Sequence, residues 1–145
     1  MIDSIIRMID CHIVHKEGND LKYLLLKRSS NKIYPNIWQC VTGKIEDGEK
    51  AYQTAIREVK EETNLNPDRL WVIEHVNFFF ESKKNRMNFI PVFGMEVNNM
   101  NIDLSNEHID YMWCDFKLAI EKLLWNQQKI GLITFNNMLQ ESKEK

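Results

Sequence analysis

The chain contains few of the residues that interrupt or cross-link a polypeptide. Only 5 glycines, 3 prolines and 3 cysteines occur among its 145 residues. Cys11, Cys40 and Cys114 are odd in number and form no Cys-x-x-Cys pair. This usage predicts reduced thiols in a cytosolic protein and argues against a disulfide framework. Without linker-like or low-complexity segments, we expect residues 1–145 to form a single domain.

The sequence also lacks an excess of positive charge and a long apolar run at its N-terminus. A formal net charge of -2 does not give the positive field that draws proteins to nucleic acid or to acidic membranes. Asp3, Arg7, Asp10 and His12 interrupt the N-terminal apolar residues, which argues against a signal peptide or a membrane span. We therefore expect a cytoplasmic protein with no nucleic-acid or membrane partner. A polyanionic substrate would have to be held locally, by a few cations or by metal.

Hydrophobic patterning predicts a mixture of strands and helices. Two apolar runs flank a turn-like segment at residues 17–20 and predict a β-hairpin, and β-branched and aromatic runs predict further strands. The expected strands are 5–14, 23–26, 37–41, 70–80, 89–97 and 111–115, with a polar connection at 81–88 and helices at 117–124 and 130–139. Together with the helix at 49–63, this order predicts an α+β protein in which helices pack on a mixed sheet.

The helix expected at 49–63 has the clearest pattern. Its apolar positions recur at spacings of three and four, so one face is apolar and the other is charged. Asp47 and Gly48 suit its start, and Glu49 is favourable in a first turn. Asn64 can adopt the left-handed conformation that ends helices, and Pro67 prevents continuation.

Three carboxylates lie on the charged face of this helix. Glu58, Glu61 and Glu62 are spaced i, i+3 and i+4, so they project together. Like charges this close repel one another and raise one another's pKa, whereas a hard cation such as Mg²⁺ relieves the repulsion through its preference for carboxylate oxygens. The alternative interpretation is a solvated face balanced by Arg57 and Lys60. Arg57 can also bridge to a neighbouring glutamate and fix its rotamer.

The residues around the helix favour the metal interpretation. Gly43, five residues, Glu49, seven residues and then Arg57-Glu58-Val59-Lys60-Glu61-Glu62-Thr63-Asn64-Leu65 resemble the Nudix box, Gx5Ex7REUxEExGU. Asn64 stands where the family has glycine, a mild departure because Asn also tolerates a left-handed helix end. The resemblance implies an α/β/α sandwich in which Glu58 and Glu62 bind Mg²⁺, or Mn²⁺ as a substitute. It further implies Glu61 as an auxiliary ligand and the carbonyl of Gly43 as a contributor.

The implied reaction is attack of water on a phosphorus of a diphosphate linkage. The Nudix resemblance also suggests an acidic group outside the box. Our candidate is Glu107, in a Glu107-His108 pair six residues before Trp113. Glu107 would ligate metal or act as general base; alternatively, it caps a surface turn. We expect His108 to be a structural neighbour.

The run Trp38-Gln39-Cys40-Val41-Thr42-Gly43 and the later pair Trp125-Asn126 resemble the bacterial dihydroneopterin triphosphate pyrophosphatase branch. That branch implies a pterin or nucleoside triphosphate, (d)NTP, as substrate and a monophosphate plus pyrophosphate as products. By the same resemblance, Arg28 and Thr42 would contact the substrate phosphates. The alternatives are a surface charge at a strand end for Arg28 and a strand residue serving the turn for Thr42.

Two other functions stay open. The run Trp-Asn-Gln-Gln-Lys is also similar to diadenosine tetraphosphate hydrolases, which makes diadenosine polyphosphate the second candidate substrate. A catalytically silent nucleotide-binding Nudix sensor is the third possibility, although such domains commonly lose box glutamates that are present here. Trp38 and Phe80 are the aromatic candidates for stacking on a purine or pterin ring; the alternative for both is core packing.

Overall fold

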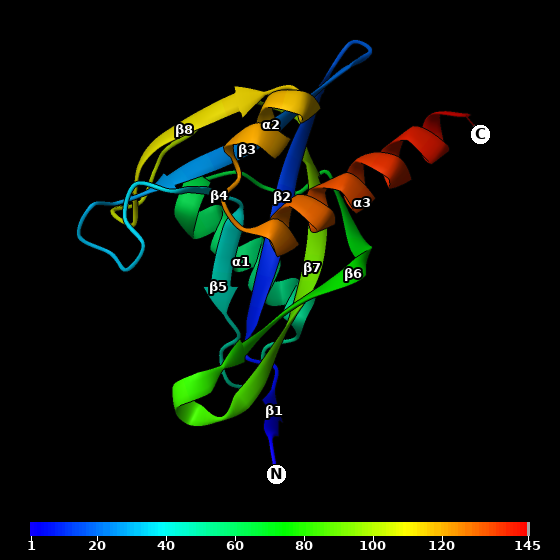
Figure 1. Cartoon of the computed structure of the whole chain (residues 1–145). Coiled ribbons are helices and arrows are strands. Elements are labelled where there is room, and N and C mark those ends of the chain that lie inside the picture. The colour runs from blue at the N-terminus through cyan, green and yellow to red at the C-terminus, as the bar shows by residue number, and fades with distance from the viewer. Residues whose placement is uncertain (145) are drawn as a thin grey trace.

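The computed structural model describes residues 1–144, which form one mixed β-sheet and three α-helices (Figure 1). The elements in chain order are β1 Asp3–Ile5, β2 Met8–Glu17, β3 Asp20–Arg28, β4 Trp38–Gln39, β5 Val41–Lys44, α1 Ala51–Thr63, β6 Arg69–Glu81, a 3-10 turn Ser82–Lys84, β7 Arg86–Val97, β8 His108–Cys114, α2 Phe116–Lys122 and α3 Asn126–Glu144.

Strand β2 is the centre of the sheet. It pairs antiparallel with β3 and β5 and parallel with β7. Strand β3 also pairs with β4 and β8, while β7 also pairs with β1 and β6. The sheet is therefore mixed, as the sequence predicts, and β3 brings together β4 and β8, which lie far from each other in the chain.

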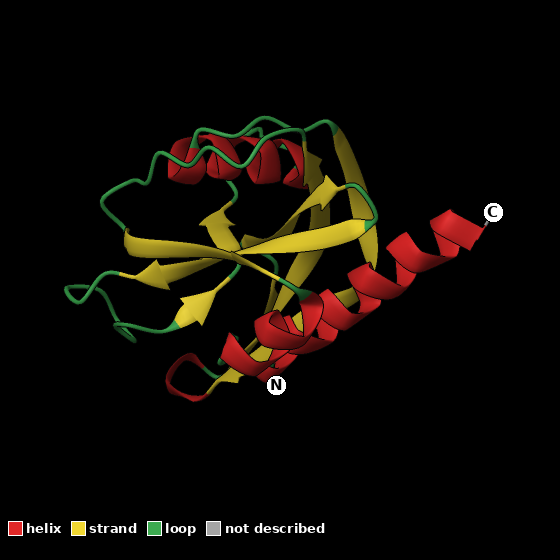
Figure 2. Cartoon of the chain, turned by 90° about the horizontal axis from the view of Figure 1, so that it is seen from above, coloured by secondary structure: helices red, strands yellow, loops and turns green. Residues whose placement is uncertain are grey.

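The helices lie on opposite faces of the sheet, so the molecule has α/β/α layers (Figure 2). Residues alternate between the two faces along each strand. Ile9, Cys11 and Ile13 of β2 pack in a core with α1 residues such as Val59. Val14 belongs to a second core, built with Tyr23 and with apolar residues of α2 and α3. This alternation decides which side chains can meet the carboxylates of α1.

Several predicted elements are confirmed and others need correction. The strand expected at 5–14 is divided, because residues 6 and 7 separate β1 from β2. The β2–β3 hairpin is present, with Gly18 in the left-handed region at φ 63°. The strand expected at 37–41 is instead two short strands, because Gln39 pairs with Leu26 of β3 whereas Val41 pairs with Cys11 of β2. The connection expected at 81–88 is also shorter, since the β6–β7 ladder continues to Glu81 and only the 3-10 turn joins the strands.

Helix α1 begins two residues later than expected. Lys50 is the residue before its first turn, and the Lys50 amide donates to the side chain of Gln53 at 2.8 Å. Glu49 lies outside the helix because its carboxylate is bound by later side chains. The predicted end is confirmed, since Asn64 adopts a left-handed conformation at φ 65° and its amide donates to the carbonyl of Lys60.

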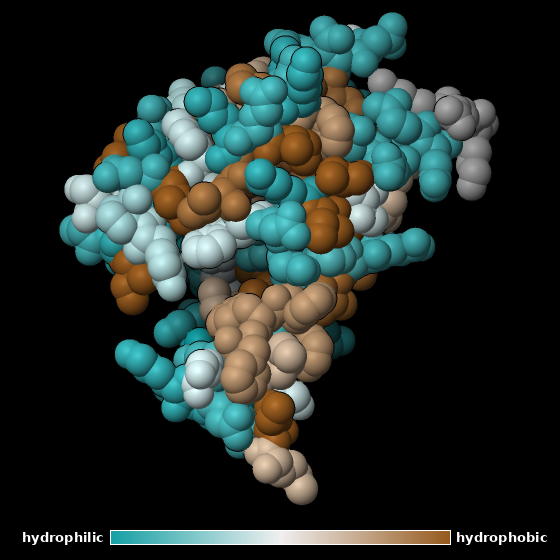
Figure 3. All heavy atoms as spheres, viewed as in Figure 1, coloured by the Kyte–Doolittle hydropathy of each residue, from teal (hydrophilic) through white to brown (hydrophobic). Residues whose placement is uncertain are grey.

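The β6–β7 hairpin extends beyond the helices and exposes aromatic side chains. Phe78, Phe79 and Phe80 are each more than two-fifths exposed, and apolar residues gather over this hairpin in the lower part of Figure 3. Among the described residues, none of the helices has the length and apolar character needed to cross a membrane.

Candidate functional site

The candidate site begins where α1 packs against β5. Glu58 lies so close to Gly43 that a Cβ at position 43 would be 2.2 Å from the Glu58 side chain. A larger residue would therefore displace the carboxylate. The glycine allows the carboxylate of Glu58 to lie against the backbone of β5, on the same face as Glu61 and Glu62 of α1.

Arg57 orders the acidic side chains through its whole guanidinium group. Its Nε donates to Glu49 Oε2 at 2.7 Å, and its Nη1 donates to Glu58 Oε1 at 2.8 Å and to Glu61 Oε2 at 3.2 Å. Its Nη2 donates to the carbonyl of Lys44 at 2.9 Å. The predicted bridge from Arg57 to its neighbours is present, and it links α1 to the loop that follows β5.

These contacts influence the pKa values of Glu49 and Glu58, which both bind Arg57. Hydrogen bonds from Arg57 and Thr54 lower the pKa of Glu49 to about 2. The pKa of Glu58 is raised, because burial outweighs the hydrogen bond from Arg57 and because Glu61 and Glu62 add negative charge nearby. Glu58 thus has the crowded environment expected of a carboxylate that gains from a nearby cation.

Glu62 is the deepest of the acidic residues, with 3% of its surface exposed. Burial opposes its ionisation, but hydrogen bonds from His108, Ser105 and Glu107 are stronger together, so the pKa of Glu62 is lowered. The hydrogen bond to Glu62 raises the pKa of Glu107. Two carboxylates at hydrogen-bonding distance are stable only if they share a proton or a cation. The sequence-predicted Glu107 is thus beside the box glutamates.

The sequence interpretation missed two polar partners in this region, Ser105 and Gln39, and it expected His108 as a structural neighbour. Ser105 Oγ donates to Glu62 Oε2 at 2.7 Å, and His108 Nδ1 lies 2.7 Å from the same oxygen. Gln39 Nε2 lies 3.2 Å from His108 Nε2. Both Gln39 and His108 belong to the motifs that carry the resemblance, but only the fold shows that the two motifs meet.

The predicted substrate-binding residues are more dispersed. Arg28 ends β3 opposite His108, and its Nε donates to the carbonyl of Ile33 at 2.8 Å. Thr42 projects from the face opposite Gly43, because adjacent strand residues alternate. Trp38 is partly buried against the α2–α3 core, with Lys27 Nζ 5.8 Å from its ring centroid. Phe80 is exposed on the β6–β7 ladder. Of these four residues, Arg28 is the one whose strand position pairs with His108, a residue that contacts a carboxylate.

The donors present suit a hard divalent cation. Glu58, Glu61, Glu62 and Glu107 supply carboxylate oxygens, and Gly43 supplies a carbonyl; oxygen is the atom that Mg²⁺ prefers. Within residues 1–144, no three His, Cys, Asp or Glu side chains are gathered closely enough to hold a metal ion as they stand. Glu58 and Glu62 are instead hydrogen-bonded to Arg57, His108 and Ser105.

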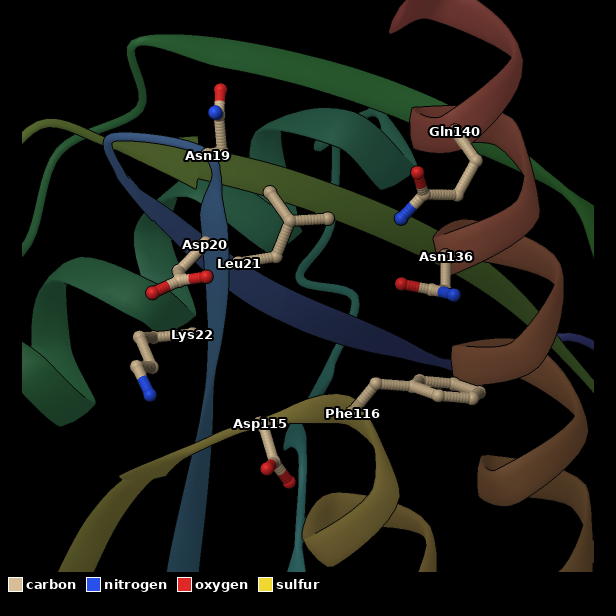
Figure 4. Close-up of a pocket in the computed structure, with 8 residues that line it drawn as sticks. All are labelled: Asn19, Asp20, Leu21, Lys22, Asp115, Phe116, Asn136 and Gln140. Carbon is tan, nitrogen blue, oxygen red and sulfur yellow. The ribbon is translucent and has the colours of Figure 1, made fainter.

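A separate hollow of about 520 Å³ lies between the tip of the β2–β3 hairpin and helices α2 and α3 (Figure 4). Its lining is mainly polar and includes Asp20, Asp115 and Asn136. None of the lining residues belongs to the acidic cluster, and the hollow is on the other helical side of the molecule. It is not part of the candidate site.

A model of the NUDIX domain matches residues 8–133, which include the whole of the box at 43–65. The chain belongs to the Nudix family. It is therefore a Nudix hydrolase of the pyrophosphohydrolase type, and the resemblance drawn from the sequence is confirmed. Nudix hydrolases generally use divalent metals, typically Mg²⁺.

Two curated relatives of this Nudix chain have different substrates in their names. A bis(5'-nucleosyl)-tetraphosphatase [asymmetrical] of Caenorhabditis elegans is 32% identical over 112 residues, covering 75% of this chain and 78% of the relative. A dihydroneopterin triphosphate diphosphatase of Escherichia coli is 31% identical over 129 residues, covering 79% and 84%. A solved Caenorhabditis elegans Ap4A hydrolase binary complex matches with a TM-score of 0.74 at 25% identity, covering 97% and 99%.

Proposed function

We propose that this Nudix hydrolase uses Mg²⁺, or Mn²⁺ as a substitute, to hydrolyse dihydroneopterin triphosphate or a (d)NTP to a monophosphate and pyrophosphate. The observation that carries the proposal is the cluster of Glu58, Glu61, Glu62 and Glu107 beside Gly43. Glu62 is buried but has a lowered pKa, so it is an ionised carboxylate in a position shielded from water. Ser105 and His108 hydrogen-bond to Oε2 of this buried charge, and a divalent cation is the further partner that the carboxylate oxygens fit.

In this proposal, Glu58 and Glu62 are the principal ligands, and Glu61 and the Gly43 carbonyl complete the protein's contribution. When bound, the cation would neutralise phosphate charge and lower the pKa of a water molecule. Arg57 keeps Glu58 and Glu61 in fixed rotamers through two hydrogen bonds from Nη1. Glu107, which is exposed beside Glu62, is either a further ligand or the group that accepts the proton of the attacking water.

The loop that follows β3 has side chains that suit a substrate with both phosphates and an aromatic ring. Arg28 ends β3, and the loop that follows it is tied to Glu107 through the Ser29 amide, which donates to the Glu107 carbonyl at 3.0 Å. The same loop carries Tyr34, which packs edge-to-face on Trp125 with ring centroids 5.1 Å apart. A cation and an aromatic pair on a loop that is hydrogen-bonded to Glu107 match the chemistry of a pterin or nucleoside triphosphate. We retain Arg28, Thr42, Trp38 and Phe80 as proposed substrate-binding residues, with Arg28 the best supported.

A second candidate function is hydrolysis of a diadenosine polyphosphate. The relative that supports it is the asymmetrical bis(5'-nucleosyl)-tetraphosphatase, at 32% identity over three quarters of this chain. The two functions share the acidic cluster and differ in what lies beyond the phosphates, so the site geometry is compatible with both.

A competition among substrates separates these functions. Purified protein with Mg²⁺ would be given dihydroneopterin triphosphate, each nucleoside and deoxynucleoside triphosphate, and diadenosine tetraphosphate, and the products identified by chromatography. We expect the largest kcat/KM for a triphosphate, with pyrophosphate as a product. A larger value for diadenosine tetraphosphate would favour the second candidate. Binding of these compounds without any turnover would favour a nucleotide-sensing domain and contradict both.

The remaining proposals concern the setting of the enzyme. We infer that residues 1–145 act as a single domain and that the protein is cytoplasmic. The three cysteines support this location, because Cys11, Cys40 and Cys114 are all buried free thiols, the state expected in a reducing compartment. The proposed partner is a small pterin or nucleotide triphosphate, with no nucleic acid or membrane.

A further inference from the structure

Glu62 receives two hydrogen bonds on a single carboxylate oxygen. Ser105 Oγ and His108 Nδ1 each lie 2.7 Å from Oε2. The Ser105 amide also donates to the Glu62 carbonyl at 3.2 Å, so the segment before β8 is fastened to α1 at two points. Because Oε2 is held from one side, the orientation of the carboxylate group is fixed, and Oε1 is the oxygen that Glu62 can direct toward a cation.

The other ring nitrogen of His108 faces Gln39. The Gln39 Nε2 amide nitrogen lies 3.2 Å from His108 Nε2. An amide nitrogen can only donate a hydrogen bond, so His108 Nε2 accepts and its hydrogen resides on Nδ1. Nδ1–H then donates to Glu62. The chain Gln39–His108–Glu62 therefore has a single direction, in which each group donates to the next.

All three members of this chain are buried, with 4% of Gln39, 7% of His108 and 3% of Glu62 exposed. Water is therefore a poor substitute for any of the three partners. Gln39 and His108 are 69 residues apart in sequence, but both are positioned by β3: Gln39 pairs with Leu26, and His108 pairs with Arg28. The sheet register brings the amide to the imidazole.

We propose that Gln39 is a positioning residue for the metal-binding carboxylate Glu62, and that it acts by holding the imidazole ring of His108. The proposal rests on the proposed function, because it assumes that Glu62 binds the divalent cation. If the Gln39 amide is lost, His108 Nε2 becomes a buried acceptor with no hydrogen-bond donor, which is costly. The ring then shifts from its position, and its Nδ1–H no longer fixes the orientation of the Glu62 carboxylate.

The test compares Gln39→Leu with variants at His108. Gln39→Leu removes the donor at similar side-chain size. His108→Asn places an amide N–H near the position of Nδ1, so it donates to Glu62 without help from Gln39. We expect Gln39→Leu to weaken Mn²⁺ binding, measured by electron paramagnetic resonance of free Mn²⁺, by about 10- to 100-fold. The same substitution should have little effect in the His108→Asn background.

Tyr23→Phe is the matched control. It removes a buried hydroxyl group whose hydrogen bond to Asn136 Oδ1 is 2.6 Å long, but on the α3 face of the sheet. Tyr23→Phe should leave the Mn²⁺ affinity unchanged. If Tyr23→Phe and Gln39→Leu weaken Mn²⁺ binding equally, the effect of Gln39 is a general loss of stability and the proposal is wrong.

A spectroscopic measurement tests the proposal independently of metal and of turnover. The ¹⁵N shifts of the His108 ring in chelator-treated protein should show hydrogen on Nδ1 in the wild type and a change in Gln39→Leu. A wild-type His108 with hydrogen on Nε2 overturns the proposal even if Gln39→Leu does not fold. A wild-type protein that shows the Nδ1–H tautomer but binds no Mn²⁺ contradicts the proposed function. Normal Mn²⁺ binding with an unaffected Gln39→Leu contradicts the role of Gln39 alone.

Discussion

The two faces of the sheet both bury ionisable side chains, but their effects on charge are opposite. On the α1 face, hydrogen bonds from Arg57 lower the pKa of Glu49 to about 2, and the pKa of buried Glu62 is also lowered. On the α3 face, burial raises the pKa of Asp10 to about 7 and lowers the pKa of His12 to about 3. The first face therefore keeps Glu49 and Glu62 charged, although the pKa of Glu58 and of Glu107 is raised there, and the second favours neutral Asp10 and neutral His12.

The supply of hydrogen-bond donors explains the difference. The Asp10 carboxyl group accepts a hydrogen bond from Asn77, which only partly opposes burial. His12 Nε2 has no hydrogen-bond partner in the described part of the chain, and nearby His75 lowers the pKa of His12 further. A buried acid remains ionised only where several donors surround it. The α1 face, with the ionised Glu62, is therefore the better suited of the two to hold a cation.

Removal of metal is the strongest test of this contrast. Excess chelator should reduce turnover to the background rate, and added Mg²⁺ should restore it, because the α1 carboxylates need the cation for the reaction. Chromatography of the monophosphate product measures both steps without a metal-dependent coupling enzyme. Full activity with chelator in excess over Mg²⁺ would remove the metal role from the α1 face.

Glu62→Gln should have the next largest effect. The substitution keeps the shape of the side chain but removes its charge, so kcat should fall by about 10²-fold or more, with a circular dichroism spectrum like that of the wild type. Asp10→Asn is the matched control, since it changes an equally buried acid on the α3 face. We expect Asp10→Asn to retain most of the activity. Equal rates for the wild type and Glu62→Gln at saturating Mg²⁺ would rule out Glu62 as a ligand.

Arg57→Ala should have a smaller effect on the same face. Arg57 orders Glu49, Glu58 and Glu61 without itself supplying a metal ligand, so we expect kcat to fall by about tenfold or more while Mn²⁺ still binds. Arg57→Lys keeps the charge but loses the forked geometry, and should restore only part of the rate. An unchanged kcat in Arg57→Ala would show that the hydrogen bonds to the three glutamates have no influence on turnover.

The smallest effects on turnover are expected on the α3 face, where pH should instead change stability. The folded protein holds a proton on Asp10 that the unfolded chain releases between pH 3.8 and about 7. The contribution of Asp10 to the free energy of unfolding therefore falls as pH rises through this window, by up to ~1.4 kcal/mol per pH unit. His12 has the opposite sign: its neutral form is favoured on folding, so its contribution rises with pH between about 3 and 6.5.

Asp10→Asn and His12→Gln separate the two contributions. Relative to the wild type, Asp10→Asn should become more stable as pH rises from 4 to 7, because its unfolded chain is no longer stabilised by release of the Asp10 proton. His12→Gln should become relatively less stable over the same range, because it lacks the gain that neutral His12 provides. Urea unfolding at several pH values measures both differences. Parallel pH profiles for the three proteins would show that neither group has the shifted pKa.

The sequence predicts the parts of this molecule that depend on local periodicity. The spacing of Glu58, Glu61 and Glu62 correctly places them on one face of α1, and the capacity of Asn64 for a left-handed conformation correctly marks the helix end. The start of α1 was misplaced because Glu49 is bound by Arg57, eight residues later. Glu49 is favourable in a first turn, but its contact with Arg57 places it before the helix.

Features that depend on register could not be predicted. The expected strand 37–41 is divided because Gln39 pairs with β3 and Val41 pairs with β2. The periodicity of one segment does not reveal which strand it pairs with. The same limit applies to Thr42 and Gly43, which are adjacent in the motif but project to opposite faces. The meeting of Gln39 with His108 likewise arises from strands that neighbour β3 but lie far apart in the sequence.

Strand β3 thus sets the register of the strands that carry Gln39 and His108. Because β2, β4 and β8 all measure their alignment against it, a slip of one residue along β3 would invert several side chains at once. A register error in β3 would therefore move His108 away from Glu62 and lower activity at the α1 carboxylates. A protein with an intact α1 and every box residue in place would still be disabled by misalignment of a strand that contributes none of the proposed metal ligands.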